Sequence, residues 1–431
     1  MTTAAEPARA VPQRRPLFVL LLAHYLSSFG NAITVITIPL YVLHTTGSSV
    51  STGLAGFANT LPLIFAGAVG GVWIDRVGGK RMSVLSDVVA GVSIGLVPLL
   101  DDTVGLPLPV LMGLLFGRSL GSTPTGAARQ SLIKPLAERG GIRLATANSW
   151  MQGAPRLGLL VGAPLAGLLI AVSGPVTGMY VDSASFLVSA LLVAVGVPHS
   201  AGPASAAQQR EGFFRQLAEG AKVVRGIPVV GAMTAFVFVT NFLDDAFTPV
   251  ILPVYSDQVL GSGQYLGWLV AASGCGAVAG TFGYSPLSAR WLTSHRWTLL
   301  GCFLVIGALR LTLTGMPGAV LSIVISFLLG LAAGPLNPAL STVMMEKVPA
   351  ALFGRVFALT SAVGMSAAPI GILVAGWSIH GIGLRGTLLC FGASYIVLVL
   401  VSLRSRALRD MDTPQAPAEE SPAADKEAVR E

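Results

Sequence analysis

The chain has 431 residues, of which 53% are hydrophobic and only 11% are charged, and its formal net charge is +7. A soluble domain of average composition carries about 25% charged residues, so this composition excludes a water-soluble fold of this size. The positive charge does not indicate a nucleic-acid-binding protein, because the basic residues punctuate apolar stretches instead of clustering beside aromatic residues.

Twelve apolar segments follow one another along the chain. A hydrocarbon layer of about 30 Å needs roughly 20 apolar residues in a helix, since only a helix satisfies every backbone group within the segment. The first segment is too long for the apolar core of a signal peptide, so we expect it to remain as the first span. The predicted spans begin near Leu17, Thr52, Ser83, Leu108, Leu144, Val176, Val229, Leu266, Trp297, Ala319, Phe353 and Leu384.

The lysine and arginine residues predict the orientation of these spans. Basic residues stay on the cytoplasmic side of a membrane. With a cytoplasmic N-terminus, most of the 27 basic residues fall in cytoplasmic ends and loops, Arg129 among them. Arg385 falls outside, and Arg118, Arg156 and Arg310 fall within spans. We expect Arg310 to extend its charged group toward the outer interface. The pattern predicts a multi-pass protein of the cytoplasmic membrane with both termini in the cytoplasm.

The remaining segments divide the chain into two halves. A Pro/Ala/Ser-rich stretch and an amphipathic run from Phe213 to Arg225 resemble a linker, and the C-terminal residues are too rich in Pro, Ala and Glu to form a core. The predicted parts are a cytoplasmic segment (1–16), an N-terminal six-helix bundle (17–198), a cytoplasmic linker (199–227), a C-terminal six-helix bundle (228–403) and a disordered cytoplasmic tail (404–431).

An internal repeat relates the two halves. A gapless offset of 214 residues aligns many glycine, proline and tyrosine residues of the first half with the same residue type in the second. Chance matching in a glycine-rich chain is the alternative. A duplication of six spans places the two copies in the same orientation, related by an axis along the membrane normal. The aligned pairs include Pro39 with Pro253, Tyr41 with Tyr255, Gly53 with Gly267, Pro124 with Pro338, Pro155 with Pro369 and Gly162 with Gly376.

The loop between the second and third spans carries a recognisable motif. It has the glycine, acid-base pair, second glycine and terminal basic pair that resemble the signature loop of the major facilitator superfamily. The resemblance implies a cytoplasmic gate, in which a glycine makes a tight turn and the acid caps a helix or pairs with an arginine. Basic anchoring at the membrane surface is the alternative. The motif residues are Gly71, Asp75, Arg76, Gly78, Lys80 and Arg81.

The same loop is not a nucleotide-binding P-loop. No glycine lies five residues before Gly79, and no serine or threonine follows Lys80. Transport driven by ATP hydrolysis in this chain alone is therefore not expected.

A wider resemblance covers residues 15 to 405. The runs Ser28-Phe29-Gly30-Asn31, Asp182 to Phe186 and Gly354-Arg355-Val356-Phe357 are similar to the macrolide-efflux and enterobactin-exporter-like branch of the superfamily. This resemblance implies export of a small amphipathic organic compound against a proton gradient.

The fifth span partly resembles the glycine-proline motif of the antiporter branches. It departs from that motif at Ala163 and Leu168, where glycines are usual. Close helix packing through small residues is an equally good explanation. The residues that match are Gly158, Gly162, Pro164 and Gly167.

Polar residues within the spans are the candidates for function, because such residues normally face the bundle interior or a watery cavity. In the first span, His24, Ser28 and Asn31 lie on one helical face. In the seventh, Asn241 and the acids Asp244 or Asp245 do the same, and Asp245 is the repeat partner of Asn31.

We predict proton coupling by Asp244, Asp245 or His24. The alternatives are an acid in a wet outer vestibule and a histidine that only packs. Asn31, Ser28, Asn241, Arg118, Arg156 and Gln152 are predicted to line a substrate cavity. Arg118 or Arg156 either contacts an anionic group of the substrate or pairs with Asp182.

These predictions describe an all-α membrane transporter that works by alternating access. Its expected partners are a small-molecule substrate, protons and membrane lipids, without nucleic acid, and the protein is expected to be a monomer. Proton-linked uptake of a small metabolite and a non-transporting membrane sensor are the alternatives. An enzyme is not expected, because no paired catalytic residues are apparent. Neither a cofactor nor a metal is expected, since the three cysteines have no metal-ligand spacing.

Overall fold

The computed structural model describes residues 13–198, 213–288, 294–409 and 411, and every regular element in this part is helical. Much of the predicted linker and tail, and most of the N-terminal segment, lies outside the described residues. The N-terminal half contains α1 (Arg15–Thr46), α2 (Ser49–Val77), α3 (Gly79–Val104), α4 (Leu108–Gly140), α5 (Leu144–Ser173) and α6 (Pro175–Gly196).

The second half is less regular than the first. The amphipathic α7 (Phe213–Gly226) precedes it, where the sequence predicts the linker helix. The half then contains α8 (Pro228–Asp244), the π-helix η1 (Phe247–Ile251), α9 (Leu252–Gln258), α10 (Gln264–Ser288), α11 (His295–Leu313), α12 (Ala319–Ala333), α13 (Leu336–Lys347), α14 (Ala350–Arg404) and the short α15 (Arg406–Arg409).

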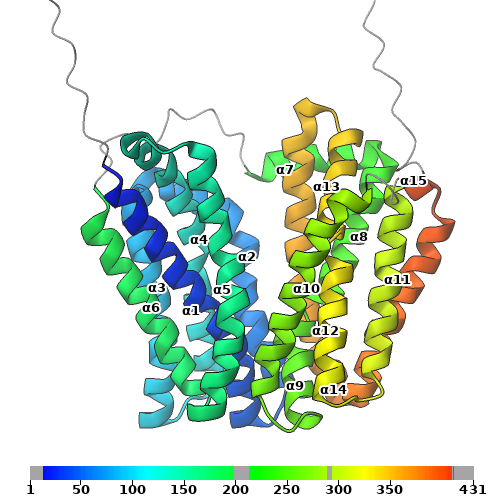
Figure 1. Ribbon diagram of the computed structural model, residues 1–431, viewed down its shortest axis with the longest axis horizontal. Helices are drawn as coiled ribbons and strands as arrows, with labels where there is room; N and C mark the ends of the chain where they lie inside the picture. Colours follow the sequence, from blue (N-terminus) through cyan, green and yellow to red (C-terminus); the bar gives the residue numbers. More distant parts are fainter. Residues whose placement is uncertain (1–12, 199–212, 289–293, 410, 412–431) are drawn as a thin grey trace, which may run out of the picture.

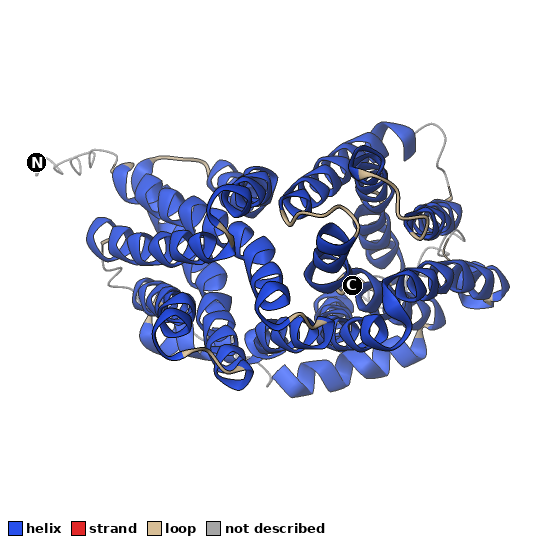
Figure 2. Ribbon diagram, turned by 90° about the horizontal axis from the view of Figure 1, so that it is seen from below, coloured by secondary structure: helices blue, strands red, loops and turns tan. Residues whose placement is uncertain are grey.

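These elements make twelve spans. In the described part, nine helical segments are long and apolar enough to cross a membrane, and α2 and α4 add two more. The long α14 supplies two spans, because Gly383 adopts φ +74° and turns the chain between them. That conformation is readily available only to glycine. The predicted fold class, twelve helices in two bundles, is confirmed, and Figures 1 and 2 show the bundles side by side.

The seventh span is interrupted near its middle. Asp245 and Ala246 form a turn after α8, and the chain continues as η1 and α9. The amide of Ile251 donates to the carbonyl of Ala246 at 3.4 Å, a bond across five residues instead of four. Pro249 lies within this turn and lacks an N–H, so the regular ladder cannot pass through it. Such π-helical turns often occur at functional sites.

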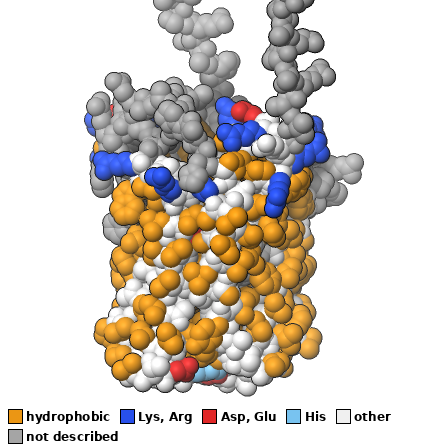
Figure 3. Space-filling view, turned by 90° about the vertical axis from the view of Figure 1, so that its left-hand side faces the viewer, with side chains coloured by type: hydrophobic (Ala, Val, Ile, Leu, Met, Phe, Trp, Pro, Cys, Tyr) orange, Lys and Arg blue, Asp and Glu red, His pale blue; other side chains and the backbone are white. Residues whose placement is uncertain are grey.

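The two ends of the molecule differ in charge. Lysine and arginine side chains gather at the end where α1 begins, which we call the basic end (Figure 3). Acidic and histidine side chains lie at the opposite end, which we call the acidic end, and orange apolar side chains cover the band between. This distribution is the one expected of a membrane protein whose basic end faces the cytoplasm.

The two halves touch near the acidic end through small residues. Gly53 of α2 lies against Gly376 of α14, where a Cβ on either glycine would be 3.2 Å from the other's Cα. The equivalent contact joins α5 to α10, with Gly167 against Gly267. The two contacts are related by the repeat, since Gly267 is the partner of Gly53.

Hydrogen bonds between the halves lie at the same end. Among the residues that the structure describes, Ser49 donates to the carbonyl of Gly376 at 3.1 Å, and His44 bonds Asp257 at 3.1 Å. The ribbons of the two halves lie farther apart toward the basic end (Figure 1). The structure is therefore closed at the acidic end.

Candidate functional site

A cavity of about 310 Å³ lies between the two halves, next to the glycine contacts. Its size falls within the usual range for small-molecule sites. Its lining residues on α1, α2 and α4 lie between the middle of these helices and their ends at the acidic end. The N-terminal half contributes the polar residues Thr34, Thr52, Asn59, Thr60 and Arg118, and the C-terminal half contributes Asn241, Asp245 and Thr248.

Arg118 forms the centre of a buried network on the N-terminal side of this cavity. Its guanidinium donates to Asp182 of α6 at 2.9 and 3.3 Å, to Asn31 of α1 at 2.7 Å and to Asn59 of α2 at 3.4 Å. Thr34 donates to the same carboxylate. Arg118 is only 5% exposed and Asp182 is fully buried. This network ties four helices together beside the cavity.

The other predicted cavity residues lie apart from this network. Arg156 and Gln152 are exposed on α5, and neither side chain has a hydrogen bond or ion pair in the part of the chain that the structure describes. Ser28 is half-buried, and its carbonyl packs against Gly158. Of the two arginines considered as partners of Asp182, the structure selects Arg118.

The adjacent acids Asp244 and Asp245 have different environments. Asp244 accepts a hydrogen bond from Arg310 of α11 at 2.5 Å, and Arg310 also donates to the carbonyl of Leu243 at 3.1 Å. Asp245 lines the cavity and is exposed, and its side chain makes no hydrogen bond or ion pair with any described residue. Asp244, the last residue of α8, is thus paired, whereas Asp245, the first residue of the turn, is unpaired among the described residues.

The prediction that Arg310 extends to the outer interface is wrong. Its side chain is 5% exposed and lies above the rings of Phe247 and Tyr395, with the guanidinium carbon 4.4 and 4.9 Å from the ring centres. The partly exposed carboxylate of Asp244 and two aromatic faces stabilise the buried guanidinium where it lies.

The structure does not place Arg129 in a cytoplasmic loop, one of the two positions that the sequence allowed for it. Arg129 is fully buried within α4 and forms an ion pair with Asp87 of α3, which is fully buried too. The guanidinium also donates to Ser83 at 3.1 Å, to Ser27 at 2.8 Å and to Ser189 at 2.6 Å. This second network lies nearer the basic end than the first.

The sequence contained a signal for this second network. Arg118 and Arg129 are 11 residues apart, about three helical turns, so both lie on one face of α4. Asp182 and Ser189 are two turns apart on α6 and meet the two arginines in order. The predicted spans include Arg118 but not Arg129, and helical spacing alone does not identify Asp87 as a partner.

His24 belongs to this second network and is absent from the cavity lining. Its Nδ1 lies 3.3 Å from a guanidinium nitrogen of Arg129. Because an arginine can only donate, Nδ1 accepts, and the proton of a neutral His24 is on Nε2. The contact does not show a role in proton coupling.

The signature loop forms the turn between α2 and α3 at the basic end. Gly78 has φ +86°, a conformation that favours glycine, so the predicted tight turn is present. Gly79 packs so close to α4 that an added Cβ would be 2.9 Å from the carbonyl oxygen of Ala128. Arg76 and Arg81 are exposed there, and Lys80 is half-buried. Gly71 lies within α2, and the side chain of Asp75 lies outside the described residues.

The glycines of α5 mediate close helix contacts. An added Cβ at Gly158 would lie 2.8 Å from the carbonyl oxygen of Ser28, and one at Gly162 would lie 2.9 Å from Cβ of Ala32. Gly167 faces α10 of the other half. Pro164 lies within the helix between them. The motif therefore serves packing within the N-terminal half and between the halves.

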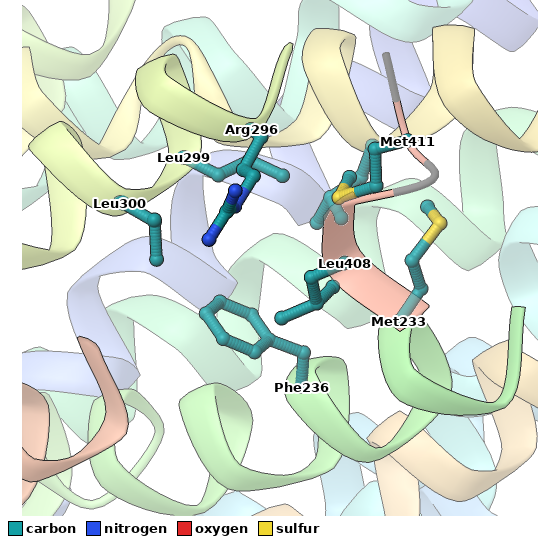
Figure 4. Close-up of a pocket in the computed structure, with 8 residues that line it drawn as sticks. Met233, Phe236, Arg296, Leu299, Leu300, Leu408 and Met411 are labelled. Atoms are coloured by element: carbon teal, nitrogen blue, oxygen red, sulfur yellow. The ribbon is translucent and has the colours of Figure 1, made fainter. Parts of the chain in front are cut away.

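A second hollow in the C-terminal half is too small to be a binding site. Met233, Phe236 and Leu408 surround it together with Arg296 (Figure 4). Its volume is about 10 Å³, which is near the minimum needed for one water molecule.

Comparison with known proteins identifies the family. The family model of the Major Facilitator Superfamily matches residues 20–371, and a second match covers residues 234–430. The chain belongs to the major facilitator superfamily. It is therefore a secondary transporter, as the signature loop and the repeat predict, and it is not an enzyme.

Relatives within the superfamily agree with the predicted branch. The multidrug efflux pump Tap of Mycolicibacterium fortuitum is 29% identical over 409 residues, which cover 94% of this chain and 99% of that protein. Macrolide efflux protein A of Streptococcus pyogenes is 24% identical and covers 90% and 95%. The enterobactin exporter EntS of Escherichia coli O139:H28 is 27% identical and covers 89% and 91%.

Solved structures share the fold at low sequence identity. The nucleoside transporter NupG superposes with a TM-score of 0.75 over 90% of this chain and 98% of that protein, at 14% identity. This likeness supports the architecture of two six-helix bundles and carries no information about substrate.

Proposed function

We propose that this protein exports small amphipathic organic compounds by proton antiport, through alternating access. The observation that carries the proposal is a cavity shared by the two halves, closed at the acidic end, with the unpaired carboxylate of Asp245 in its wall. In the proposed orientation the basic end faces the cytoplasm. The structure then corresponds to the state that loads from the cytoplasm.

The proposed coupling uses Asp245. A carboxylate without a protein partner can take up a proton when the cavity opens outward and release it when the cavity opens inward. Asp244, the neighbouring residue in the chain, forms an ion pair with Arg310. Arg118, the other charged residue of the cavity lining, forms an ion pair with Asp182. Asp245 is therefore free to exchange a proton without breaking an ion pair.

The first test is drug accumulation in an efflux-deficient host. Cells that make the protein are expected to accumulate less of at least one antibiotic or siderophore, and an uncoupler is expected to abolish the difference. Greater accumulation in cells that make the protein would favour proton-linked uptake instead. Specific binding without any flux would favour a sensor.

The coupling role has its own test in proteoliposomes with an imposed proton gradient. We expect Asp245→Asn to reduce the gradient-driven flux of a compound identified in the accumulation assay to the level of liposomes without protein. The reason is that an amide cannot take up and release a proton as a carboxylate does. Asp102→Asn, which removes an exposed acid outside the cavity, is the control and should retain flux. Undiminished flux in Asp245→Asn would exclude this acid as the coupling group.

A further inference from the structure

One of the two charged side chains in the lining of the central cavity has an ion-pair partner, and the other has none among the described residues. Arg118 and Asp245 are the charged side chains in its described lining. The positive charge of Arg118 is neutralised by Asp182, and its donors are directed to Asp182, Asn31 and Asn59. The negative charge of Asp245 has no such partner within the described part of the chain. The cavity therefore presents an excess negative charge to a ligand.

The rest of the lining combines neutral polar residues with aliphatic side chains. Val35 and Met365 are each 42% exposed and come from opposite halves, and Ile38 and Ile372 add further aliphatic surface. None of the described lining residues is aromatic, so a cation could not be held over a ring face in this cavity. The carboxylate of Asp245 can pair with a positive charge there, and the neutral oxygens of Asn59 and Asn241 can add only weaker contacts.

We infer that the cavity selects lipophilic organic cations, with Asp245 as the residue that binds the positive charge and the aliphatic residues of both halves holding the apolar body. The inference rests on the proposed export function and adds the substrate class to it. A proton and a cationic substrate then occupy the same carboxylate in turn. Anionic compounds are disfavoured, because Arg118 is not available to them without breaking its bond to Asp182.

The inference is tested by binding, without any gradient. Radiolabelled tetraphenylphosphonium serves as the probe for purified full-length protein in detergent at neutral pH. We expect saturable binding that is competed weakly by the neutral triphenylphosphine oxide. Radiolabelled tetraphenylborate, measured in a separate sample because it pairs with the probe in solution, should show no saturable binding. A preference of the wild-type protein for the anion or the neutral compound would overturn the inference, and this comparison needs no variant.

Variants then locate the charge contact. Asp245→Asn should weaken binding of the probe roughly 10- to 100-fold, as expected for the loss of a contact to a charged group. Asp245→Glu should restore much of it, whereas Thr248→Val, which removes a neutral polar group from the same wall, should have a much smaller effect. Equal binding by Asp245→Asn and wild type, with both monodisperse on size-exclusion chromatography, would overturn the assignment.

The outcome can be separated from that of the proposed function. Cation binding at Asp245 without flux would refute export and leave the substrate class intact. Export that depends on the proton gradient but shows no preference for cations would refute the substrate class alone.

Discussion

Replacing Asp87 with alanine is expected to lower the free energy of unfolding by about 3–5 kcal/mol, because the change leaves the charge of Arg129 buried without its carboxylate. Both side chains are fully buried, and the serine hydroxyls around the guanidinium cannot supply a negative charge. The measurement is the amount of monodisperse protein that survives heating in detergent. We expect a large decrease in the temperature at which half is lost.

A double variant separates the loss of the pair from the loss of volume. Asp87→Leu combined with Arg129→Met removes both charges, and we expect it to recover most of the thermal stability that either single change loses. Burying two apolar side chains in place of an ion pair is often neutral or stabilising. If Asp87→Ala were as stable as the wild type, the pair would contribute nothing to folding and our view of this network would be wrong.

Replacing Gly267 with leucine is expected to abolish transport while leaving the protein folded. A Cβ at this position would lie 2.3 Å from the carbonyl oxygen of Ala163 and 3.0 Å from Cα of Gly167, both in the other half. Backbone atoms cannot move aside as a flexible side chain can. The two halves are therefore held apart at the acidic end, and the cycle stops in the outward-open state.

The matched control for this change is Gly274→Leu. Gly274 lies on the same helix, α10, but an added Cβ there meets nothing within 4 Å, so transport should persist. In a protein with Cys275, Cys302 and Cys390 replaced by serine, a cysteine at position 241 reports access to the cavity. A membrane-impermeant maleimide added outside should label it faster in Gly267→Leu than in Gly274→Leu. Equal labelling and retained transport would show that this contact does not close the cavity.

The fold was predictable because the bilayer imposes strong constraints on sequence. Long apolar segments and alternating basic loops determine the number of spans, and the glycine contacts that join the halves fall on residues that the repeat aligns.

The sequence analysis does not predict the break in the seventh span. Pro249 and Pro253 were visible, but α1 carries Pro39 at the position equivalent to Pro253 and remains a continuous helix. A π-helical turn depends on local packing that helical periodicity does not report.

The site was predictable in part. The helical spacing of polar residues predicts that Asn31, Arg118 and Asn241 face the interior. In the structure Arg118 donates to Asn31, and Asn241 lies in the cavity wall. Spacing could not assign partners to the charged groups. The pairing of Arg310 with Asp244 leaves Asp245 unpaired, and that division depends on how α8 and α11 pack together.

The cavity wall is divided between the two six-helix bundles, which follow one another along a single chain. Neither bundle holds a complete site, since Asn59 and Arg118 belong to one and Asn241 and Asp245 to the other. A compound bound there contacts both bundles and therefore strengthens their association. If the polypeptide were cut between residues 199 and 212, the two fragments should co-purify more firmly with such a compound present than in its absence.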